Sequence, residues 1–146
     1  MYATLEEITG QKKQKLGGED GYSLAPVFQG QPASGRDTLI SHSIGGSFAI
    51  RRDSWKLCLS HGSGGWSAPR EPDAKKRGLP PLQLFNLAKD PGEKKNVAKD
   101  EPEKVQTLLK LLASQVRNGR CTPGEKANND RNVTFLPKGV TMSADD

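Results

Sequence analysis

The chain has 146 residues, a length that favours one domain of ordinary size and hardly allows two. Hydrophobic residues make up only 33% of it, and it carries 22 Lys and Arg against 17 Asp and Glu. No stretch approaches the roughly 18 consecutive apolar residues of a transmembrane helix. The N-terminus lacks the basic start and apolar core of a signal peptide. We therefore expect no membrane partner, and two cysteines exclude a disulfide-rich scaffold.

The positive charge lies in the second half of the chain. Residues 1–73 carry eight basic and eight acidic side chains, whereas residues 74–146 carry fourteen and nine, which accounts for the net charge of +5. Nucleic-acid binders usually gather basic residues on one face, with aromatic side chains among them for stacking. Here basic and acidic residues are mixed, and aromatic residues make up 5% of the chain. This pattern favours a solvated surface and no nucleic-acid partner over a groove that tracks phosphates.

The N-terminal segment predicts one short helix and a connector. Residues 2–9 have helical composition, and Gly10 is a suitable residue to end the helix. A helix of this length is marginal alone and needs a surface on which to pack. Residues 11–37 are polar and rich in turn formers, apart from an apolar patch at residues 24–28. We interpret them as a connector.

A run of β-strands follows the connector. Strands are predicted at residues 38–43, 47–52, 55–60 and 82–87. In the third of these, Trp55, Leu57 and Leu59 alternate with other residues and so share one face. Short connections between the first three strands predict an antiparallel meander. Residues 61–81 are rich in Gly, Ser and Pro and predict a long loop before the last strand.

The strongest single signal is a helix over residues 102–118, ended by Gly119. Its apolar residues recur at helical spacing and form one stripe that can cover a face of the sheet: Val105, Leu108, Leu109, Leu112 and Val116. The tail that follows is polar and predicted to be irregular. The fold class is therefore α+β: a small antiparallel sheet of about four strands, one long C-terminal helix packed on it, a short N-terminal helix and long loops.

One segment resembles a catalytic motif. Formylglycine-dependent sulfatases oxidise the cysteine of Cys-x-Pro-x-Arg to the aldehyde nucleophile, and residues 121–125 read Cys-Thr-Pro-Gly-Glu. Glu125 places an acid where that motif needs a cation. We therefore expect Cys121 to be a turn residue or a disulfide partner. The glycine-rich residues 62–65 lack the Gly-Lys-Ser/Thr of a phosphate-binding loop.

The remaining reactive side chains do not form a recognisable site. Cys58, Cys121, His42 and His61 are not spaced as zinc ligands. His42 has no evident carboxylate partner for acid–base catalysis. Cys58 and Cys121 can pair with each other or stay free thiols, and the residues leave this open. Residue chemistry alone predicts no active site.

Several segments taken in order nevertheless resemble one family, the C-terminal part of type I, arylsulfatase-like sulfatases of the alkaline-phosphatase superfamily. Each segment is weak alone, and their order and spacing make the resemblance specific. They are Tyr2–Gly10, Glu19–Leu24, His42–Arg51 with Trp55–Leu57, Gly62–Ser67, Gln83–Leu87 with Asp90–Glu93, and Gly119–Gly124 with Asn129 and Asp130.

The resemblance implies that the chain is part of a larger enzyme. Such sulfatases have a large α/β domain that carries calcium, the formylglycine and most catalytic groups, followed by a smaller C-terminal subdomain. Residues 1–37 then correspond to the end of the large domain and residues 38–146 to the C-terminal subdomain. The catalytic residues of the family have no counterpart here, so we predict that this chain alone is inactive and holds no cofactor. Its partner would be the missing large domain, in cis or as a separate chain.

The resemblance also implies a location and a role. Such enzymes are commonly periplasmic, secreted or lysosomal, and an oxidising compartment favours a disulfide between Cys58 and Cys121. The small subdomain lies beside the active-site cleft, so His42, Arg51 and Trp66 are candidates for contact with a sulfated substrate. For Arg51 the competing interpretation is packing within the meander.

Two functions are therefore predicted from the sequence. The first is a C-terminal sulfatase fragment without the catalytic core, which contributes stability and contacts at the substrate mouth. The alternative is a stand-alone module that binds polyanions or sulfated glycans through Lys75, Lys76 and Arg77 and the basic second half of the chain.

Overall fold

The computed structural model describes residues 1–11, 20–32 and 36–143. Their strands form one antiparallel sheet in which each strand pairs with the next along the chain, in the order β1-β2-β3-β4. The strands are β1 (Thr38–His42), β2 (Phe48–Arg52), β3 (Trp55–Cys58) and β4 (Gln83–Asn86). The predicted meander and the α+β class are confirmed, because alternating apolar residues and short connections specify such a sheet locally.

The register of the strands gives the sheet two different faces. Ile40 pairs with Ile50, Ile50 with Leu57, and Leu57 with Leu84, so one face is a continuous apolar surface. On the opposite face, Arg51 lies between Leu39 and Lys56. Partners in a ladder point to the same side of a sheet, and their chain neighbours point to the other.

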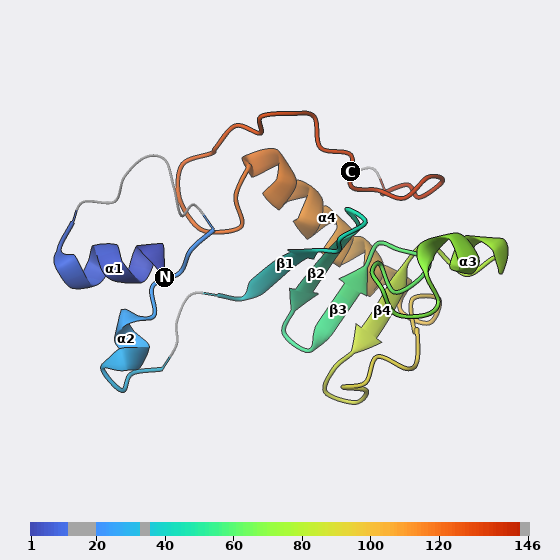
Figure 1. Ribbon diagram of the computed structural model, residues 1–146, viewed down its shortest axis with the longest axis horizontal. Coiled ribbons are helices and arrows are strands. Elements are labelled where there is room, and N and C mark those ends of the chain that lie inside the picture. The colour runs from blue at the N-terminus through green and yellow to red at the C-terminus, as the bar shows by residue number, and fades with distance from the viewer. Residues whose placement is uncertain (12–19, 33–35, 144–146) are drawn as a thin grey trace.

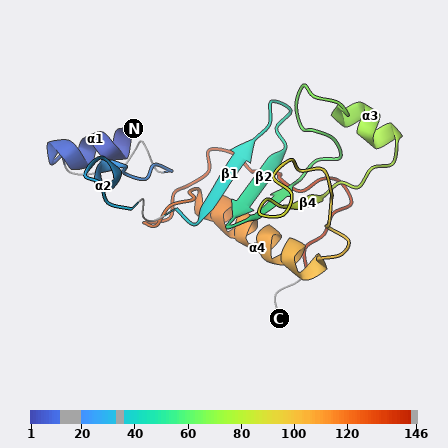
Figure 2. The same cartoon turned by 90° about the horizontal axis from the view of Figure 1, so that it is seen from below.

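Helix α4 (Pro102–Asn118) covers the apolar face. Figure 2 shows it running along the sheet beneath β1 and β2. Gly119 ends the helix in the left-handed conformation, with φ of 63°, where a side chain would be strained. The predicted bounds of this helix are confirmed. The buried core combines residues of the last three strands and of the helix: Ile50, Leu57, Leu59, Leu84, Val105, Leu108, Leu109 and Leu112.

Two helices lie apart from the sheet, at one end of the molecule (Figure 1). Helix α1 (Tyr2–Thr9) matches the prediction, and α2 (Ala25–Phe28) is a single turn inside the expected connector. Thr4 of α1 is 1% exposed, and its Oγ1 accepts a hydrogen bond of 3.0 Å from the backbone N–H of Leu24. Part of the connector lies outside the described residues, and the predicted domain boundary after residue 37 stays a prediction.

Helix α3 (Glu71–Lys76) lies within the segment expected to be a loop. Composition hid it because the flanking residues are Gly, Ser and Pro, although Pro72 is well placed in a first helical turn. Ala74 of this helix is fully buried. The helix therefore fixes the segment that joins β3 to β4.

The residues after α4 have no helix or strand as far as residue 143, as predicted. The polar composition of this tail did not indicate that it contacts the core, but four of its side chains pack there: Phe135, Leu136, Val140 and Met142. Asn129 Nδ2 also donates to the carbonyl of Val116 at 2.6 Å. None of the helices described is long and apolar enough to cross a membrane.

Candidate functional site

Residues 60–71, here called the Trp66 loop, are anchored on β4. Ser60 Oγ donates to the Gly62 carbonyl at 2.9 Å. Gln83 Nε2 on β4 donates to the carbonyls of Ser60 and Gly62 at 2.9 and 2.8 Å. Gly62 is buried, and a Cβ there would collide with the backbone carbonyl of Pro69. These hydrogen bonds and the close packing of Gly62 therefore hold the first residues of the loop in place.

A carboxylate holds the loop from its other end. Glu71, at the start of α3, accepts hydrogen bonds from the backbone N–H groups of His61 at 3.2 Å and Gly62 at 2.9 Å. Lys75 Nζ lies 3.5 Å from the same carboxylate. Burial raises the pKa of Glu71, but the two backbone hydrogen bonds and the charges of Lys75 and His61 outweigh it and leave the pKa below its ordinary value.

The tip of the loop is closed by further hydrogen bonds. The backbone N–H of Ser63 donates to the Pro69 carbonyl at 2.9 Å, and Ser63 Oγ donates to the Ser67 carbonyl at 2.6 Å. The backbone N–H of Gly65 donates to Ser63 Oγ at 3.2 Å. Trp66, between these contacts, is nevertheless 73% exposed. A well-constrained loop thus holds a large aromatic side chain in solvent.

Arg70 lies close to Trp66, and the Trp66 loop packs against the β1–β2 turn. Arg70 Nε donates to the Trp66 carbonyl at 3.4 Å, and Arg70 Cζ lies 6.0 Å from the centre of the indole ring. Gly64 packs against the β1–β2 turn, where a Cβ added to it would lie 3.1 Å from Ser43 Cβ. Ile44 in that turn is 73% exposed. The Trp66 loop and the turn therefore lie side by side.

His42 is the last residue of β1, on the helix-facing side of the sheet. It pairs with Phe48, and the two rings meet edge to face with centres 3.8 Å apart. Its ring lines a cavity of about 380 Å³ that also contacts Arg120 and Asn129 of the tail. His42 is therefore exposed at a cavity, with an aromatic neighbour.

Arg51 lies on the opposite face of the sheet. Its Nε donates to the Asp53 carbonyl at 3.1 Å, and its side chain is exposed. Beside it, Lys56 Nζ forms an ion pair with both carboxylate oxygens of Glu93, at 2.7 and 2.8 Å. Arg51 therefore lies on the exposed face of the sheet, away from the packed core.

The three predicted substrate residues therefore do not form one site. His42 and the Trp66 loop lie at the same end of the sheet, where β1 leads into β2 and β3 leads into the loop. Arg51 lies at the other end, near the β2–β3 turn, and on the other face. The assignment of these residues to substrate contact stays a prediction.

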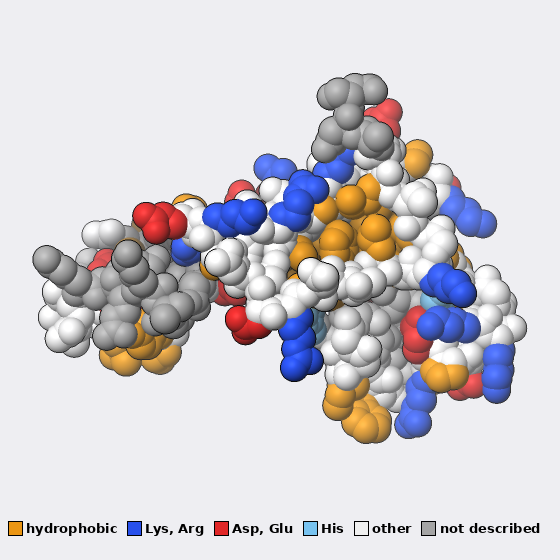
Figure 3. All heavy atoms as spheres, turned by 90° about the horizontal axis from the view of Figure 1, so that it is seen from above, with side chains coloured by type: hydrophobic (Ala, Val, Ile, Leu, Met, Phe, Trp, Pro, Cys, Tyr) orange, Lys and Arg blue, Asp and Glu red, His pale blue; other side chains and the backbone are white. Residues whose placement is uncertain are grey.

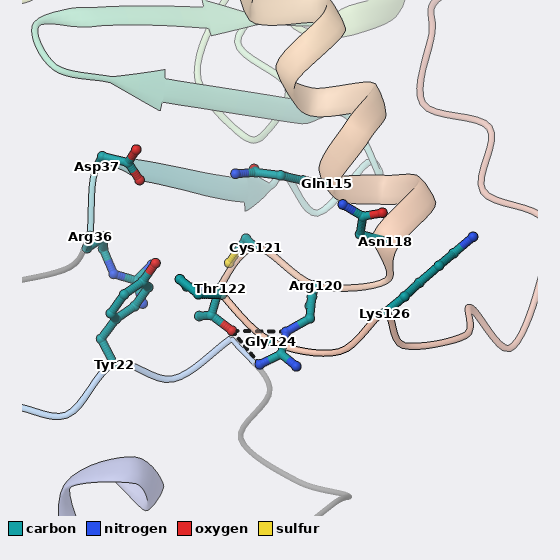
Figure 4. A pocket seen from close by; sticks show the side chains of 11 residues that line it. Tyr22, Arg36, Asp37, Gln115, Asn118, Arg120, Cys121, Thr122, Gly124 and Lys126 are labelled. Atoms are coloured by element: carbon teal, nitrogen blue, oxygen red, sulfur yellow. Dashed lines mark hydrogen bonds between the residues drawn. The ribbon is translucent and has the colours of Figure 1, made fainter.

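A larger cavity, of about 720 Å³, lies between the residues before β1 and those after α4 (Figure 4). Arg36 stacks over the Tyr22 ring with its Cζ 4.8 Å from the ring centre. Opposite them, the Arg120 guanidinium donates to Thr122 Oγ1 at 2.8 and 3.2 Å. Sequence reasoning missed this cavity because no motif links these segments, which meet only when α4 returns the chain to the start of β1.

A side chain of α4, Gln115, contacts the start of β1. Its Nε2 donates to Thr38 Oγ1 at 2.8 Å, across 77 residues of sequence. Its Oε1 is buried and has no hydrogen-bond partner among the residues that the structure describes. Gln115 therefore joins the end of α4 to the start of β1 at the wall of the large cavity.

Both cysteines are poor nucleophiles. Burial and the neighbouring Asp20 raise the pKa of Cys121 to about 11. The backbone N–H of Cys121 also donates to Asp20 Oδ1 at 2.6 Å. Burial likewise raises the pKa of Cys58 on β3. Both are free thiols in the structure, so a disulfide between them stays a prediction, and thiols with raised pKa values are protonated at neutral pH.

Comparison with known proteins gives the chain a family. Human arylsulfatase A is 31% identical to it over 143 residues, which cover 86% of this chain and 25% of arylsulfatase A. A solved sulfatase structure, described under the metabolism of multiple glycosaminoglycans by Bacteroides thetaiotaomicron, superposes with a TM-score of 0.61 at 26% identity. It matches 78% of this chain and 23% of its own. This chain is a sulfatase-like C-terminal domain. No family model matches it.

The sulfatase-like domain spans about a quarter of the length of the two relatives. That this domain holds neither calcium nor formylglycine stays a prediction. The Cys121 thiol has a pKa of about 11 and Glu125 stands in the cation position of the formylglycine motif. No group of three or more His, Cys, Asp or Glu residues that could hold a metal ion occurs in the described part of the chain.

Proposed function

We propose that this domain serves as the C-terminal subdomain of a sulfatase, joined to or assembled with a catalytic portion outside this chain. The observation that carries the proposal is the similarity to arylsulfatase A, which covers 86% of this chain and only 25% of that enzyme. The catalytic portion would supply the formylglycine, the calcium and the hydrolysis of the sulfate ester. The present domain would stabilise that portion and contact the substrate.

An uncovered apolar surface supports this proposal. Six large apolar side chains of α1 and α2, here called the α1–α2 face, are between 41% and 66% exposed: Tyr2, Leu5, Ile8, Leu24, Val27 and Phe28. Large apolar side chains exposed in such a number on so short a segment are typical of an interface. Helix α1 has only eight residues, too few for much stability without packing. A catalytic portion that covers this face would supply the missing packing surface.

The proposal is tested by assembly. The solved Bacteroides sulfatase, produced without the quarter that this chain matches, is co-expressed with this chain and assayed with an aryl sulfate. We expect a complex that hydrolyses the ester, whereas the chain alone does not. Replacing Leu5 and Ile8 by Glu should weaken the complex at least about tenfold. Val133→Glu, a matched change at an exposed apolar residue of the tail, should leave it intact.

Two results would contradict the proposal. Turnover by the chain alone would require an active site in this domain. Failure to assemble, together with saturable binding of sulfated glycans by the chain alone, would instead favour a stand-alone binding module. A urea unfolding curve of each variant separates loss of the interface from loss of the fold.

A further inference from the structure

We propose that Trp66 and Arg70 form a platform that binds a sulfated saccharide, with the indole under the sugar ring and the guanidinium on the sulfate. The inference rests on the proposed sulfatase function and deepens it by naming residues and a substrate class. Of the three candidates suggested by the sequence it uses Trp66, because Arg51 lies at the other end of the sheet and on its other face.

The first argument is the contrast between the exposure of Trp66 and the order of its loop. The indole is 73% exposed although the loop is held by Glu71, Gln83 and the hydrogen bonds of Ser63. An exposed aromatic ring on a mobile loop can collapse onto nearby surface, whereas the backbone that carries this ring is held by several hydrogen bonds. A rigid aromatic side chain loses little conformational entropy on binding, which is why Trp is enriched at binding sites.

The second argument concerns the shape and polarity of the surface. The flat indole face suits the CH groups on one side of a pyranose ring, which form an apolar plane. Ile44, on the turn against which the loop packs, is also 73% exposed. The loop also carries two hydroxyl side chains on either side of Trp66 in sequence, Ser63 and Ser67, and hydroxyl groups suit sugar hydroxyls. A saccharide therefore fits this mixture better than an aliphatic peptide would.

The third argument is charge. Arg70 Cζ lies over one face of the indole, 6.0 Å from its centre, so a sugar ring would stack on the other face of this 73% exposed side chain. The guanidinium on its flexible side chain would then supply the cation for the sulfate of the sugar. Lys75, Lys76 and Arg77 follow on the same segment, and all three are exposed. Figure 3 shows Lys and Arg side chains gathered at the end of the molecule where Figure 1 places α3. The nearby Glu71 does not oppose them, because its carboxylate is bound to two backbone N–H groups and to Lys75.

The chain offers a direct probe, because it has two tryptophans and one is half-buried. Trp55 lies on β3 with Lys104 Nζ 5.6 Å from its ring centre. A Trp55→Phe background leaves Trp66 as the single tryptophan of the full chain, which can be excited selectively at wavelengths where the two tyrosines absorb little. We expect saturable quenching by a sulfated chondroitin disaccharide, weaker quenching by the unsulfated disaccharide, and none by inorganic sulfate at the same concentrations.

Calorimetry in the wild-type background separates the two residues. Trp66→Ala should weaken binding of the sulfated disaccharide about tenfold or more, and Trp66→Phe should weaken it less, because a smaller aromatic face remains. Arg70→Gln should reduce the preference for the sulfated over the unsulfated disaccharide. Lys89→Ala, an exposed lysine at the other end of β4, should change neither.

The proposal is overturned if no saturable quenching occurs, if Trp66→Ala binds as tightly as the unchanged chain, or if inorganic sulfate binds as well as the disaccharide. It is also overturned if Trp66→Ala weakens assembly with a catalytic portion and leaves sugar binding unchanged, since Trp66 would then be an interface residue. Any of these results, obtained with successful assembly, leaves the proposed function intact. Sugar binding without assembly overturns the proposed function instead.

Discussion

Two regions of the molecule expose large apolar side chains, and they are held in opposite ways. The Trp66 loop is tied to the sheet by Gln83 and to α3 by Glu71, so the backbone of the loop that carries the exposed indole is held in place. The α1–α2 face exposes six apolar side chains on two short helices, and Thr4 supplies the hydrogen bond that joins them. Figures 1 and 2 both show these helices away from the sheet.

This difference separates two reasons for exposing apolar surface. A preorganised residue is ready to bind a small ligand, because little ordering remains to be done when the ligand arrives. A face on short helices with few ties gains its order from whatever covers it, as expected of an interface with another domain. The two regions should therefore respond differently to changes in the core, at Glu71 and at Thr4.

The largest expected effect is in the core between the sheet and α4. Leu109 on α4 is fully buried, and Leu109→Ala should lower the free energy of unfolding by about 2–5 kcal/mol, because it leaves a cavity against the sheet. Urea unfolding measures the loss, and hydrogen exchange locates it. The sheet and the Trp66 loop should lose protection together, whereas α1 should not.

Leu111→Ala is the matched control for that change. Leu111 lies on the same helix but is only partly buried, so a smaller loss is expected. Equal loss of protection in α1 after Leu109→Ala would show that the two regions form one cooperative unit. The contrast between them would then be wrong.

The next effect concerns Glu71. Glu71→Gln removes the negative charge of the carboxylate that accepts hydrogen bonds from the His61 and Gly62 N–H groups. Hydrogen bonds to charged groups contribute about 1.5–3 kcal/mol to stability. We expect faster hydrogen exchange at these two amides and faster motion of the indole in time-resolved fluorescence anisotropy. Asp73→Asn, at an exposed acid of the same helix, should change neither. Unchanged exchange in Glu71→Gln would mean that the loop is rigid without this carboxylate.

The pKa of Glu71 gives the same contact a pH dependence. Because its folded pKa lies below the ordinary value of 4.5, its contribution is complete above that pH and is lost as the pH falls through the folded pKa. The amide proton shifts of His61 and Gly62 should therefore stay constant as the pH falls from neutrality to the ordinary pKa of 4.5, and should titrate only below it. A titration midpoint above 4.5, or the same titration in Glu71→Gln, would contradict this assignment.

The parts of the fold that were predictable are those in which one strand or helix carries its own pattern. Trp55, Leu57 and Leu59 alternate because β3 buries one face, and the stripe from Val105 to Val116 marks α4 for the same reason. Helices α2 and α3 were missed because they are short and begin near prolines in loop-like sequence. Their stability comes from packing of Ala25 and Ala74, which local composition does not report.

The site was less predictable, because it depends on register and on contacts distant in sequence. The separation of His42 from Arg51 follows from the pairing of His42 with Phe48 and Leu39 with Arg51, which the sequence leaves undetermined. Glu71 accepts a hydrogen bond from the Gly62 N–H at the other end of the Trp66 loop, and Gln115 donates one to Thr38 across 77 residues of sequence. The glycine-rich segment before Trp66 did indicate a special backbone, since Gly62 has no room for a side chain.

The smallest expected effect lies in the α1–α2 face and completes the comparison. Thr4→Val keeps the shape of a side chain that is 1% exposed but removes the acceptor of the Leu24 N–H. The loss should be about 1 kcal/mol, because an unpaired backbone donor remains, and should be confined to α1 and α2. Hydrogen exchange should accelerate in α1 while the urea midpoint of the sheet and α4 stays unchanged.

Thr9→Ala removes a hydrogen bond within α1, from an exposed hydroxyl to the Leu5 carbonyl, and should accelerate exchange less. If a catalytic portion covers the α1–α2 face, its binding should abolish the difference between Thr4→Val and Thr9→Ala, whereas a sugar bound at Trp66 should leave that difference as it is.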